Sequence, residues 1–299
     1  TMKSCVVDPV LASFANPISV TIDDDTLAQA PVLYGRLIKG VKNGPSPDWL
    51  QQQLRAIGLR PISFLVDVTN WFTYDLNRPL HVFDADKISG NSLRLHRAKG
   101  TETLMGLDDK EYTLPEGATV ISDGQGPESI GGVMGGLATG CTADTTSVFV
   151  EAAYFDPIRT AYTGRALKIN SDARYRFERG IDPAFTPIGL EHAVRMIVDH
   201  AGGEASEVVQ AGQIPDTSRA YKLDTDRCSS LVGMDIPADT QRATLTALGF
   251  VMDGDMAQVP SWRPDVQGTA DLVEEVARIA SLSNLTPVPM PRVSAGVPA

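Results

Sequence analysis

Four short segments of this 299-residue chain contain residue types that could do chemistry. His81 lies in the segment RPLHVFD at residues 78–84, and seven glycines fall within residues 124–140. Five cationic and two acidic side chains fall within residues 165–179, and four acids fall within residues 265–275. Each segment has a functional interpretation and a structural one, and the residues alone leave both open.

The glycine-rich segment is typical either of a tight loop or of a pocket wall that presents bare backbone amides. No Gly-Lys-Ser/Thr follows it, so it lacks the lysine of a nucleotide phosphate loop. The spacing of Gly132, Gly136 and Gly140 would suit a membrane-helix dimer, but these glycines do not lie in a long apolar segment. A pocket wall is therefore the functional interpretation that remains.

His81 is a candidate catalytic side chain, and the alternative is a histidine that serves only packing. Metal ligation is not favoured, because no second histidine or cysteine lies at ligand spacing from it. The sequence also has no GxSxG segment, so nothing in it favours a Ser-His-Asp hydrolase.

Charge is distributed unevenly along the chain. The cationic segment 165–179 stands in a chain whose net charge is −11, which favours a local contact with a polyanion. A solvated turn held by salt bridges is the alternative. In the acidic segment, Asp271, Glu274 and Glu275 share one helical face, where carboxylates could bind Mg²⁺ or simply favour the helix dipole.

The hydrophobic pattern places these segments among alternating strands and helices. Apolar runs predict strands within residues 33–38, 62–66, 118–121, 147–151 and 220–223, with Glu151 at the end of the fourth, and a hairpin over 250–259. Periodicity and capping predict helices from Ser46-Pro47-Asp48 to Gly58 and over 187–201, 238–248 and 269–281.

Composition excludes several classes of protein. A net charge of −11 does not suit non-specific binding to nucleic acid or to anionic membranes. No run of 18 apolar residues exists, and no signal peptide is recognisable at the start of the sequence. The three cysteines form neither a disulfide framework nor a zinc site, so we expect reduced thiols in the cytoplasm.

Six segments, taken in order, together resemble the β subunit of bacterial phenylalanyl-tRNA synthetase. They are VDVTN at 66–70, PLHVFD at 79–84, GGVMGG at 131–136, SDARYRFERG at 171–180, PSWRPD at 260–265 and DLVEEVAR at 271–278. The resemblance implies an α+β fold, which we expect to be part of a longer subunit. Its expected parts are a lead-in at 1–30, a mixed-sheet tRNA-editing module at 31–204, a linker at 205–218, a winged-helix-like α/β module at 219–287 and a proline-rich tail at 288–299.

The resemblance also implies an activity, partners and cofactors. The editing module would hydrolyse the ester of tyrosine mischarged on tRNA(Phe), whereas the whole enzyme would ligate phenylalanine to tRNA(Phe). The implied partners are the tRNA 3′ end and the α subunit, in an α2β2 tetramer, with no membrane contact. Editing would need no cofactor, because ATP is used only by the α subunit. Mg²⁺ would be shared with that subunit.

Matching the segments residue by residue gives each candidate side chain an implied role. Glu151 falls on the acceptor of the tyrosine hydroxyl, and Gly132, Gly135 and Ala173 fall on positions that keep the pocket open. The polar residues around the ester and the terminal adenosine are His81, Thr69, Asn70 and Arg60, with Ser171 where the family often has threonine. The implied Mg²⁺ ligands are Asp265, Asp271, Glu274 and Glu275.

The expected mechanism is attack of a positioned water molecule on the ester carbonyl, with His81 orienting the water and loop amides stabilising the oxyanion. Two other hypotheses stay open. The chain could be a non-catalytic scaffold or nucleic-acid-binding module, although residues 219–287 carry six cationic and ten acidic side chains, which disfavours phosphate contacts. It could also be a free-standing deacylase that edits in trans.

Overall fold

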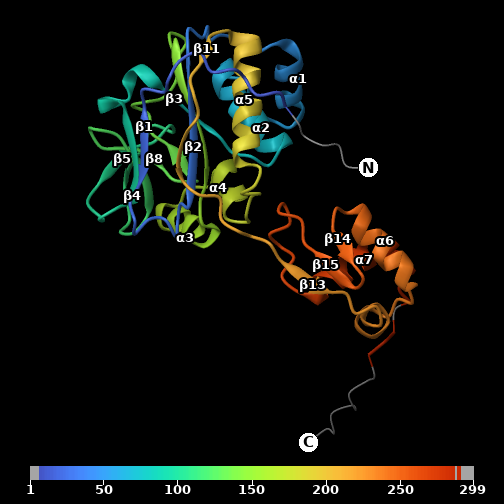
Figure 1. Ribbon diagram of the computed structural model, residues 1–299. Helices are drawn as coiled ribbons and strands as arrows, with labels where there is room; N and C mark the ends of the chain where they lie inside the picture. The colour runs from blue at the N-terminus through green and yellow to red at the C-terminus, as the bar shows by residue number, and fades with distance from the viewer. Residues whose placement is uncertain (1–6, 287, 291–299) are drawn as a thin grey trace, which may run out of the picture. The chain divides into compact units, whose positions relative to one another are not determined.

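The computed structural model describes residues 7–286 and 288–290, which divide into a first unit up to Thr217 and a second unit from Ser218 (Figure 1). The strands of the first unit are β1 Ser19–Ile22, β2 Val32–Lys39, β3 His81–Asp84, β4 Ser92–Arg97, β5 Thr103–Met105, β6 Glu111–Thr113, β7 Thr119–Ser122, β8 Pro127–Ile130, β9 Met134–Gly135, β10 Ser147–Tyr154, β11 Glu204–Ala205 and β12 Val209–Gly212. Its helices are α1 Asp48–Ala56, α2 Phe64–Asp75, α3 Pro157–Leu167, α4 Asp172–Phe177 and α5 Thr186–Ala201, with 3₁₀ turns at Ala85–Lys87 and Ser89–Asn91.

Two main sheets organise the first unit. One has the strand order β11-β2-β10-β3, with β12 also paired to β2, and its pairs are antiparallel. The other has the order β1-β4-β7-β8-β9 and is mixed, because β1 runs parallel to β4. A separate hairpin joins β5 and β6. This arrangement confirms the expected α+β class with a mixed sheet.

The β2–β10–β3 sheet lies between helices on one face and the second sheet on the other (Figure 1). Strand alternation decides what each face contains, because successive side chains point to opposite sides. Along β10, Val148 and Val150 face the helices, whereas Phe149 and Ala153 belong to the core between the sheets.

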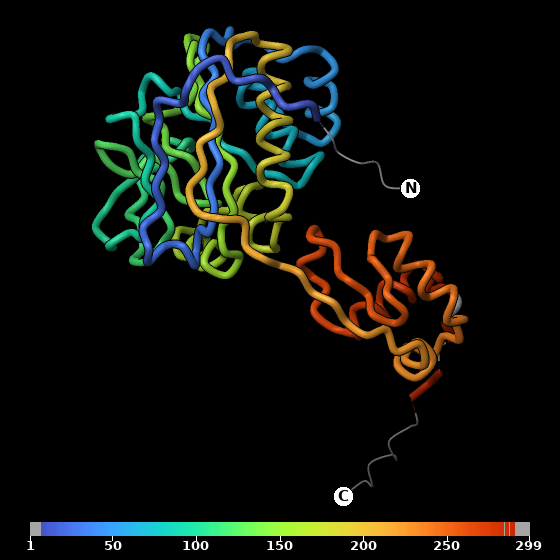
Figure 2. The backbone as a smooth tube through the Cα atoms, in the orientation of Figure 1, coloured from blue at the N-terminus to red at the C-terminus, as the bar shows by residue number. Residues whose placement is uncertain are grey.

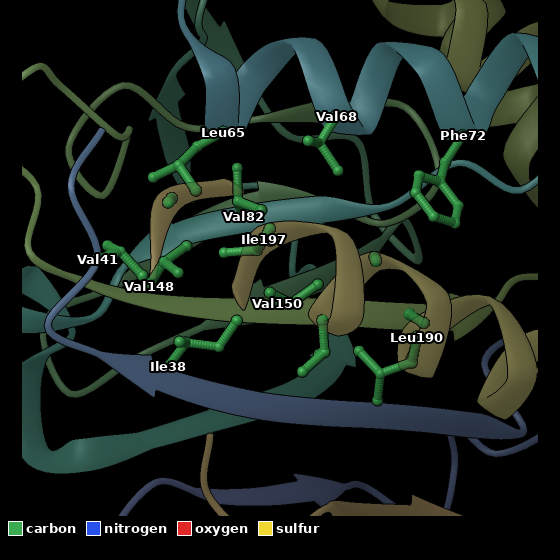
Figure 3. Close-up of a cluster of buried hydrophobic side chains, with 14 of the residues drawn as sticks. Ile38, Val41, Leu65, Val68, Phe72, Val82, Val148, Val150, Leu190 and Ile197 are labelled. Carbon is green, nitrogen blue, oxygen red and sulfur yellow. The ribbon is translucent and has the colours of Figure 1, made fainter. Parts of the chain in front are cut away.

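The helix-side core is apolar and closed. Figure 3 shows side chains of the sheet packed against two helices. The labelled residues are Ile38, Val82, Val148 and Val150 in strands and Val41 just after β2, against Leu65, Val68, Phe72, Leu190 and Ile197 in the helices. Fully burying an aliphatic or aromatic side chain stabilises the fold by roughly 1.5–3 kcal/mol. This core therefore gives the functional side chains a rigid sheet to stand on.

One strand prediction is wrong. Residues 62–66 form no strand, because α2 begins at Phe64 with Ser63 at its N-cap. Phe64, Val68 and Phe72 recur at intervals of four residues and bury one helical face. A run of five apolar residues is too short to show that period, which explains the error.

The expected lead-in and linker are also partly structured. Residues 19–22 form β1 beside β4, and residues 209–212 form β12 beside β2. Figure 2 traces the N-terminal segment, in dark blue, alongside the chain that follows α5, and Phe14 and Ser206 form a parallel bridge there. The lead-in at 1–30 and the linker at 205–218 therefore contribute strands to the first unit.

The second unit has the predicted strand, hairpin and two helices. Its elements are β13 Ala220–Lys222, the π-helical turn Cys228–Val232, α6 Ala238–Ala247, β14 Val251–Asp253, β15 Met256–Gln258, α7 Thr269–Ala280 and a 3₁₀ turn at Leu282–Asn284. The hairpin strands β14 and β15 extend to β13 in a three-stranded sheet. Leu245, Phe250, Leu272 and Val276 are among the residues of its separate core.

The cysteines and the lengths of the helices bear on two expectations drawn from composition. Cys141 and Cys228 are free thiols, as predicted, and Cys5 lies outside the described residues. Among the helices that the structure describes, none is long and apolar enough to cross a bilayer. The proline-rich tail falls mostly outside the described residues.

Candidate functional site

A small hollow of about 60 Å³ is lined by strands of both sheets of the first unit and by α4. Five of the residues singled out from the sequence line it: His81, Gly132, Gly135, Glu151 and Ala173. The other lining residues are Pro79, Leu80, Ser129, Ile130, Val133, Met134, Phe155 and Phe177. The fold therefore brings together residues that lie up to 92 positions apart, between 81 and 173.

Glu151 stands in the middle of β10, not at a strand end as predicted. The strand continues to Tyr154, and Glu151 shares the inter-sheet face with Phe149 and Ala153. Only 5% of Glu151 is exposed. A carboxyl group thus points into what is otherwise an apolar layer.

The Glu151 carboxyl accepts no hydrogen bond from any residue that the structure describes. Burial raises its pKa to about 7, and the positive charge of Arg78 opposes this rise. A buried carboxyl without a partner is unfavourable by roughly 1–3 kcal/mol or more. This arrangement is typical of a group that a ligand is meant to satisfy.

His81 is directly opposite Glu151 in the β3–β10 register, so both side chains project from the same face of the sheet. Its Nε2 atom is buried and has no hydrogen-bond partner among the described residues. Burial lowers the pKa of His81 to about 4, so the imidazole is neutral near pH 7. A neutral imidazole can accept or donate one hydrogen bond, for example with water.

Two glycines of the GGVMGG segment leave room beside His81. A Cβ atom on Gly135 would overlap the His81 ring. Gly132 has a φ of +70°, which favours glycine, and a Cβ there would press on Phe155 and Phe177. The pocket-wall interpretation of this segment therefore has direct geometric support.

Arg78 is a buried arginine whose charge acts on Glu151, and the sequence analysis missed it. The side chain is only 1% exposed. Nη1 donates to Oγ1 of Thr186 at 2.9 Å, Nη2 donates to the Ala153 carbonyl, and Nε donates to the Pro79 carbonyl at 3.3 Å. Arg78 thereby joins α5, β10 and the loop before His81. Its position three residues before His81 was the available signal.

Ser171 and Ala173 enter the site through the short helix α4. Ser171 caps the helix by accepting the amide of Arg174 at 3.1 Å, and its hydroxyl donates to the Val133 carbonyl at 2.6 Å. Ala173 and Phe177, one turn apart, line the hollow. Ser171 therefore positions α4 against the glycine segment, and it does not line the hollow itself.

The other predicted polar residues do not line the hollow. Thr69 and Asn70 lie in α2, where the Thr69 hydroxyl donates to the Val66 carbonyl at 2.8 Å. Arg60 is exposed between α1 and α2, and its side chain has no hydrogen bond or ion pair within the described part of the chain. Contact of these three residues with a substrate stays a prediction.

The acidic residues of the second unit do not form a metal site by themselves. Asp265 pairs with Arg263 at 2.6 Å, and Glu275 pairs with Arg263 at 2.8 Å and Arg278 at 2.7 Å. The Asp271 carboxylate accepts the amide of Gln267. No three acid, histidine or cysteine side chains in the described ranges are arranged to hold a metal ion. Arginines therefore pair with two of the four predicted ligands, Asp265 and Glu275, and binding of Mg²⁺ by Asp265, Asp271, Glu274 and Glu275 together with another subunit stays a prediction.

Comparison with known proteins matches both units to protein families. The B3/4 domain model matches residues 29–202, and the tRNA synthetase B5 domain model matches residues 221–281. The phenylalanine--tRNA ligase beta subunit of Ruegeria pomeroyi is 66% identical over 298 residues, and that of Cereibacter sphaeroides is 61% identical over 298 residues. These matches cover 100% and 99% of this chain but 37% of each relative, so the chain spans little more than a third of their length.

A solved N-terminal fragment of the phenylalanyl-tRNA synthetase β subunit from Pyrococcus horikoshii also matches, with 15% identity and a TM-score of 0.43. That match covers 90% of this chain and 76% of the fragment. The resemblance expected from the six segments is confirmed by the family models and by the two bacterial relatives.

Proposed function

Because this chain belongs to the B3/4 domain family, we propose that its first unit hydrolyses the ester between a mischarged amino acid and the 3′ end of tRNA. The substrate we propose is tyrosine attached to tRNA(Phe). The relatives are named phenylalanine--tRNA ligase beta subunit, so we also propose that the chain works as part of such a ligase, beside an α subunit and tRNA.

The observation that carries the proposal is the pair of unsatisfied polar groups in one hollow. Nε2 of His81 is buried and has no hydrogen-bond partner among the described residues, and the Glu151 carboxyl, on a residue only 5% exposed, accepts no hydrogen bond from them. A tyrosine hydroxyl donates one hydrogen bond, and an ionised Glu151 accepts one. Phenylalanine would leave the carboxyl unsatisfied, which gives discrimination of roughly 10⁴-fold in sites of this kind.

The chemistry needs only water and positioning. Water adds to the ester carbonyl, the bond to the ribose oxygen breaks, and free amino acid and a ribose hydroxyl result. Neutral His81 accepts a hydrogen bond from the attacking water, which orients the water towards the carbonyl. The amides of Gly131, Val133 and Gly136 already donate to protein carbonyls, so the glycine amides left to donate to the developing oxyanion are those of Gly132 and Gly135.

Entry of a phenol ring requires the lining to move. A hollow of about 60 Å³ has room for a few water molecules, since roughly 10–15 Å³ of such space holds one. Met134 is half-buried in the wall, and methionine is the most adaptable apolar side chain. Displacement of Met134 would enlarge the hollow without disturbing the sheet.

Deacylation by the intact ligase tests the proposal. Tyrosyl-tRNA(Phe) and phenylalanyl-tRNA(Phe) would be supplied to the wild type, Glu151→Gln and a control, Glu128→Gln. Glu128 is also a buried acid of the first unit, but its carboxylate already accepts a bond from Thr139 at 2.8 Å. We expect Glu151→Gln to lose at least tenfold in tyrosyl-tRNA hydrolysis and the control to keep it. Equal hydrolysis by wild type and Glu151→Gln would disprove the assigned role.

A further inference from the structure

Two arginine–tyrosine stacks lie on the outer side of α4. The guanidinium of Arg179 lies 3.6 Å from the ring centre of Tyr175, and that of Arg176 lies 4.3 Å from the ring centre of Tyr74. Tyr175 is 52% exposed and Tyr74 is 37% exposed. We refer to these four residues as the α4 surface. Both arginines are also ion-paired, Arg176 with Asp172 at 3.6 Å and Arg179 with Glu178 at 2.8 Å, so the surface offers exposed tyrosine rings covered by arginines.

The α4 surface is attached to the wall of the hollow. Ala173 and Phe177 line the hollow from the same helix. A helix of six residues is about 9 Å long at 1.5 Å per residue. The α4 surface therefore lies within reach of the nucleotide that would carry an aminoacyl group bound in the hollow. The Tyr74 hydroxyl donates to Asp172 at 2.7 Å and ties α2 to this helix.

Unpaired cations flank the same helix. Arg165 and Lys168 are exposed, and their side chains make no hydrogen bond or ion pair with any residue that the structure describes. They lie at the end of α3, which contacts α4 where Gly164 meets Arg174. In a chain of net charge −11, two unpaired cations on a helix that contacts α4, together with the stacked aromatic rings of α4, match the pattern of a single-stranded nucleic-acid site.

We propose that the α4 surface binds the single-stranded 3′ end of RNA, with a base stacked on the Tyr175–Arg179 platform and phosphates neutralised by Arg165 and Lys168. This proposal rests on the proposed function, because it supplies the place for the nucleotides next to the ester. Stacking on aromatic rings tolerates any base, whereas the cations contact the backbone.

The alternative is a purely structural role for the stacks. Arg179 also pairs with Glu178 at 2.8 Å and donates to the Tyr175 carbonyl at 2.9 Å. Those contacts fix the guanidinium in place without any ligand. A structural role would leave RNA affinity unchanged when Tyr175 loses its ring, so the two explanations predict different binding.

Fluorescence anisotropy at low salt would measure binding of an uncharged, labelled RNA oligonucleotide ending in CCA to the chain. Stacking contributes roughly 1–3 kcal/mol per base, so Tyr175→Leu should weaken binding about tenfold, and Tyr175→Phe should restore it. Arg165→Ala with Lys168→Ala should reduce the slope of log affinity against log salt by about 1.4. Arg55→Ala, an exposed arginine on α1, is the matched control and should change neither.

Unchanged affinity in Tyr175→Leu, or no RNA binding by the wild type at low salt, would overturn the proposal. The readout is independent of hydrolysis, since the oligonucleotide carries no ester. Tyr175-dependent binding by a chain whose intact ligase does not deacylate would support the α4 surface and disprove the editing function. Deacylation by the intact ligase, together with RNA binding that does not depend on Tyr175, would support the editing function and disprove the role of the α4 surface.

Discussion

Replacing Arg78 by methionine should destabilise the first unit and raise the pKa of Glu151. Methionine fills similar space but leaves the Thr186 hydroxyl and the carbonyls of Ala153 and Pro79 without their buried donor. A buried polar group without a partner is unfavourable by roughly 1–3 kcal/mol, so three of them should lower the free energy of unfolding by about 4 kcal/mol. Apolar replacement of a buried ion is neutral only when its partners are replaced too.

The pKa of Glu151 in two Arg78 variants separates the effect of the arginine's charge from the effect of its hydrogen bonds. Removing a nearby positive charge should raise the pKa of Glu151 by about one unit or more. Arg78→Lys retains the charge but cannot donate in three directions at once, so the pKa of Glu151 should stay near 7 while stability falls by about 2 kcal/mol.

Urea unfolding and carbon NMR of labelled glutamate carboxyls would measure both quantities. The control is Arg195→Met, which removes an arginine of α5 that bonds at the surface and should change stability by less than about 0.5 kcal/mol. If Arg78→Met unfolds within about 1 kcal/mol of the wild type and leaves the Glu151 titration unchanged, the reasoning about Arg78 is refuted. If Arg78→Met does not fold, the stability of Arg78→Lys still measures the loss of the arginine's hydrogen bonds.

Three further predictions concern other parts of the chain. Gly135→Ala should displace the His81 ring, reduce deacylation at least tenfold and lower the free energy of unfolding by about 1–3 kcal/mol. Normal deacylation by this variant would show that residue 135 does not contact His81. Burial raises the pKa of Glu151 from 4.5 to about 7, so the carboxyl keeps its proton to a higher pH in the folded state than in the unfolded state. The free energy of unfolding should therefore fall by about 3 kcal/mol as the pH rises from 4.5 to 7. Urea titrations of Glu151→Gln should therefore show a stability advantage that grows from pH 4.5 to 7, and a constant difference would contradict the shift. Arg263→Met should speed hydrogen exchange of α7 amides roughly tenfold, because buried Glu275 loses one of its two cationic partners; unchanged exchange would show that Arg278 suffices.

Elements that depend on local interactions could be predicted from the sequence, whereas elements that depend on pairing between distant segments could not. The helix after Ser46 and the helix ending at Gly202 follow from local periodicity, and both are confirmed. The predicted cap is wrong, because Pro47 stands at the N-cap and the Ser46 hydroxyl donates to Asp67 instead. Strand β1 could not be found this way, because Ser19 pairs with Ser92 on a strand 73 residues away. Its four residues become a strand only when the second sheet supplies the partner.

The candidate site shows the same division. Glu151, His81 and Gly135 meet as the resemblance implied, but only the β3–β10 register shows that the acid and the imidazole share one face. Arg78 could not be singled out from the sequence, because most arginines lie at the surface. Its burial shows that it is a structural side chain of the site. Arg60 does not line the hollow, so its contact with an RNA end stays a prediction.

Binding of amide-linked aminoacyl-adenosine analogues, which water cannot cleave readily, tests the central claim most directly. Calorimetry would compare the tyrosyl and phenylalanyl analogues on the wild type and on Glu151→Ala. We expect the wild type to bind the tyrosyl analogue at least 100-fold more tightly, and the variant to lose that preference. Equal affinity of the wild type for both analogues, or a preference that survives in Glu151→Ala, would contradict the role of a buried carboxyl in recognising the tyrosine hydroxyl.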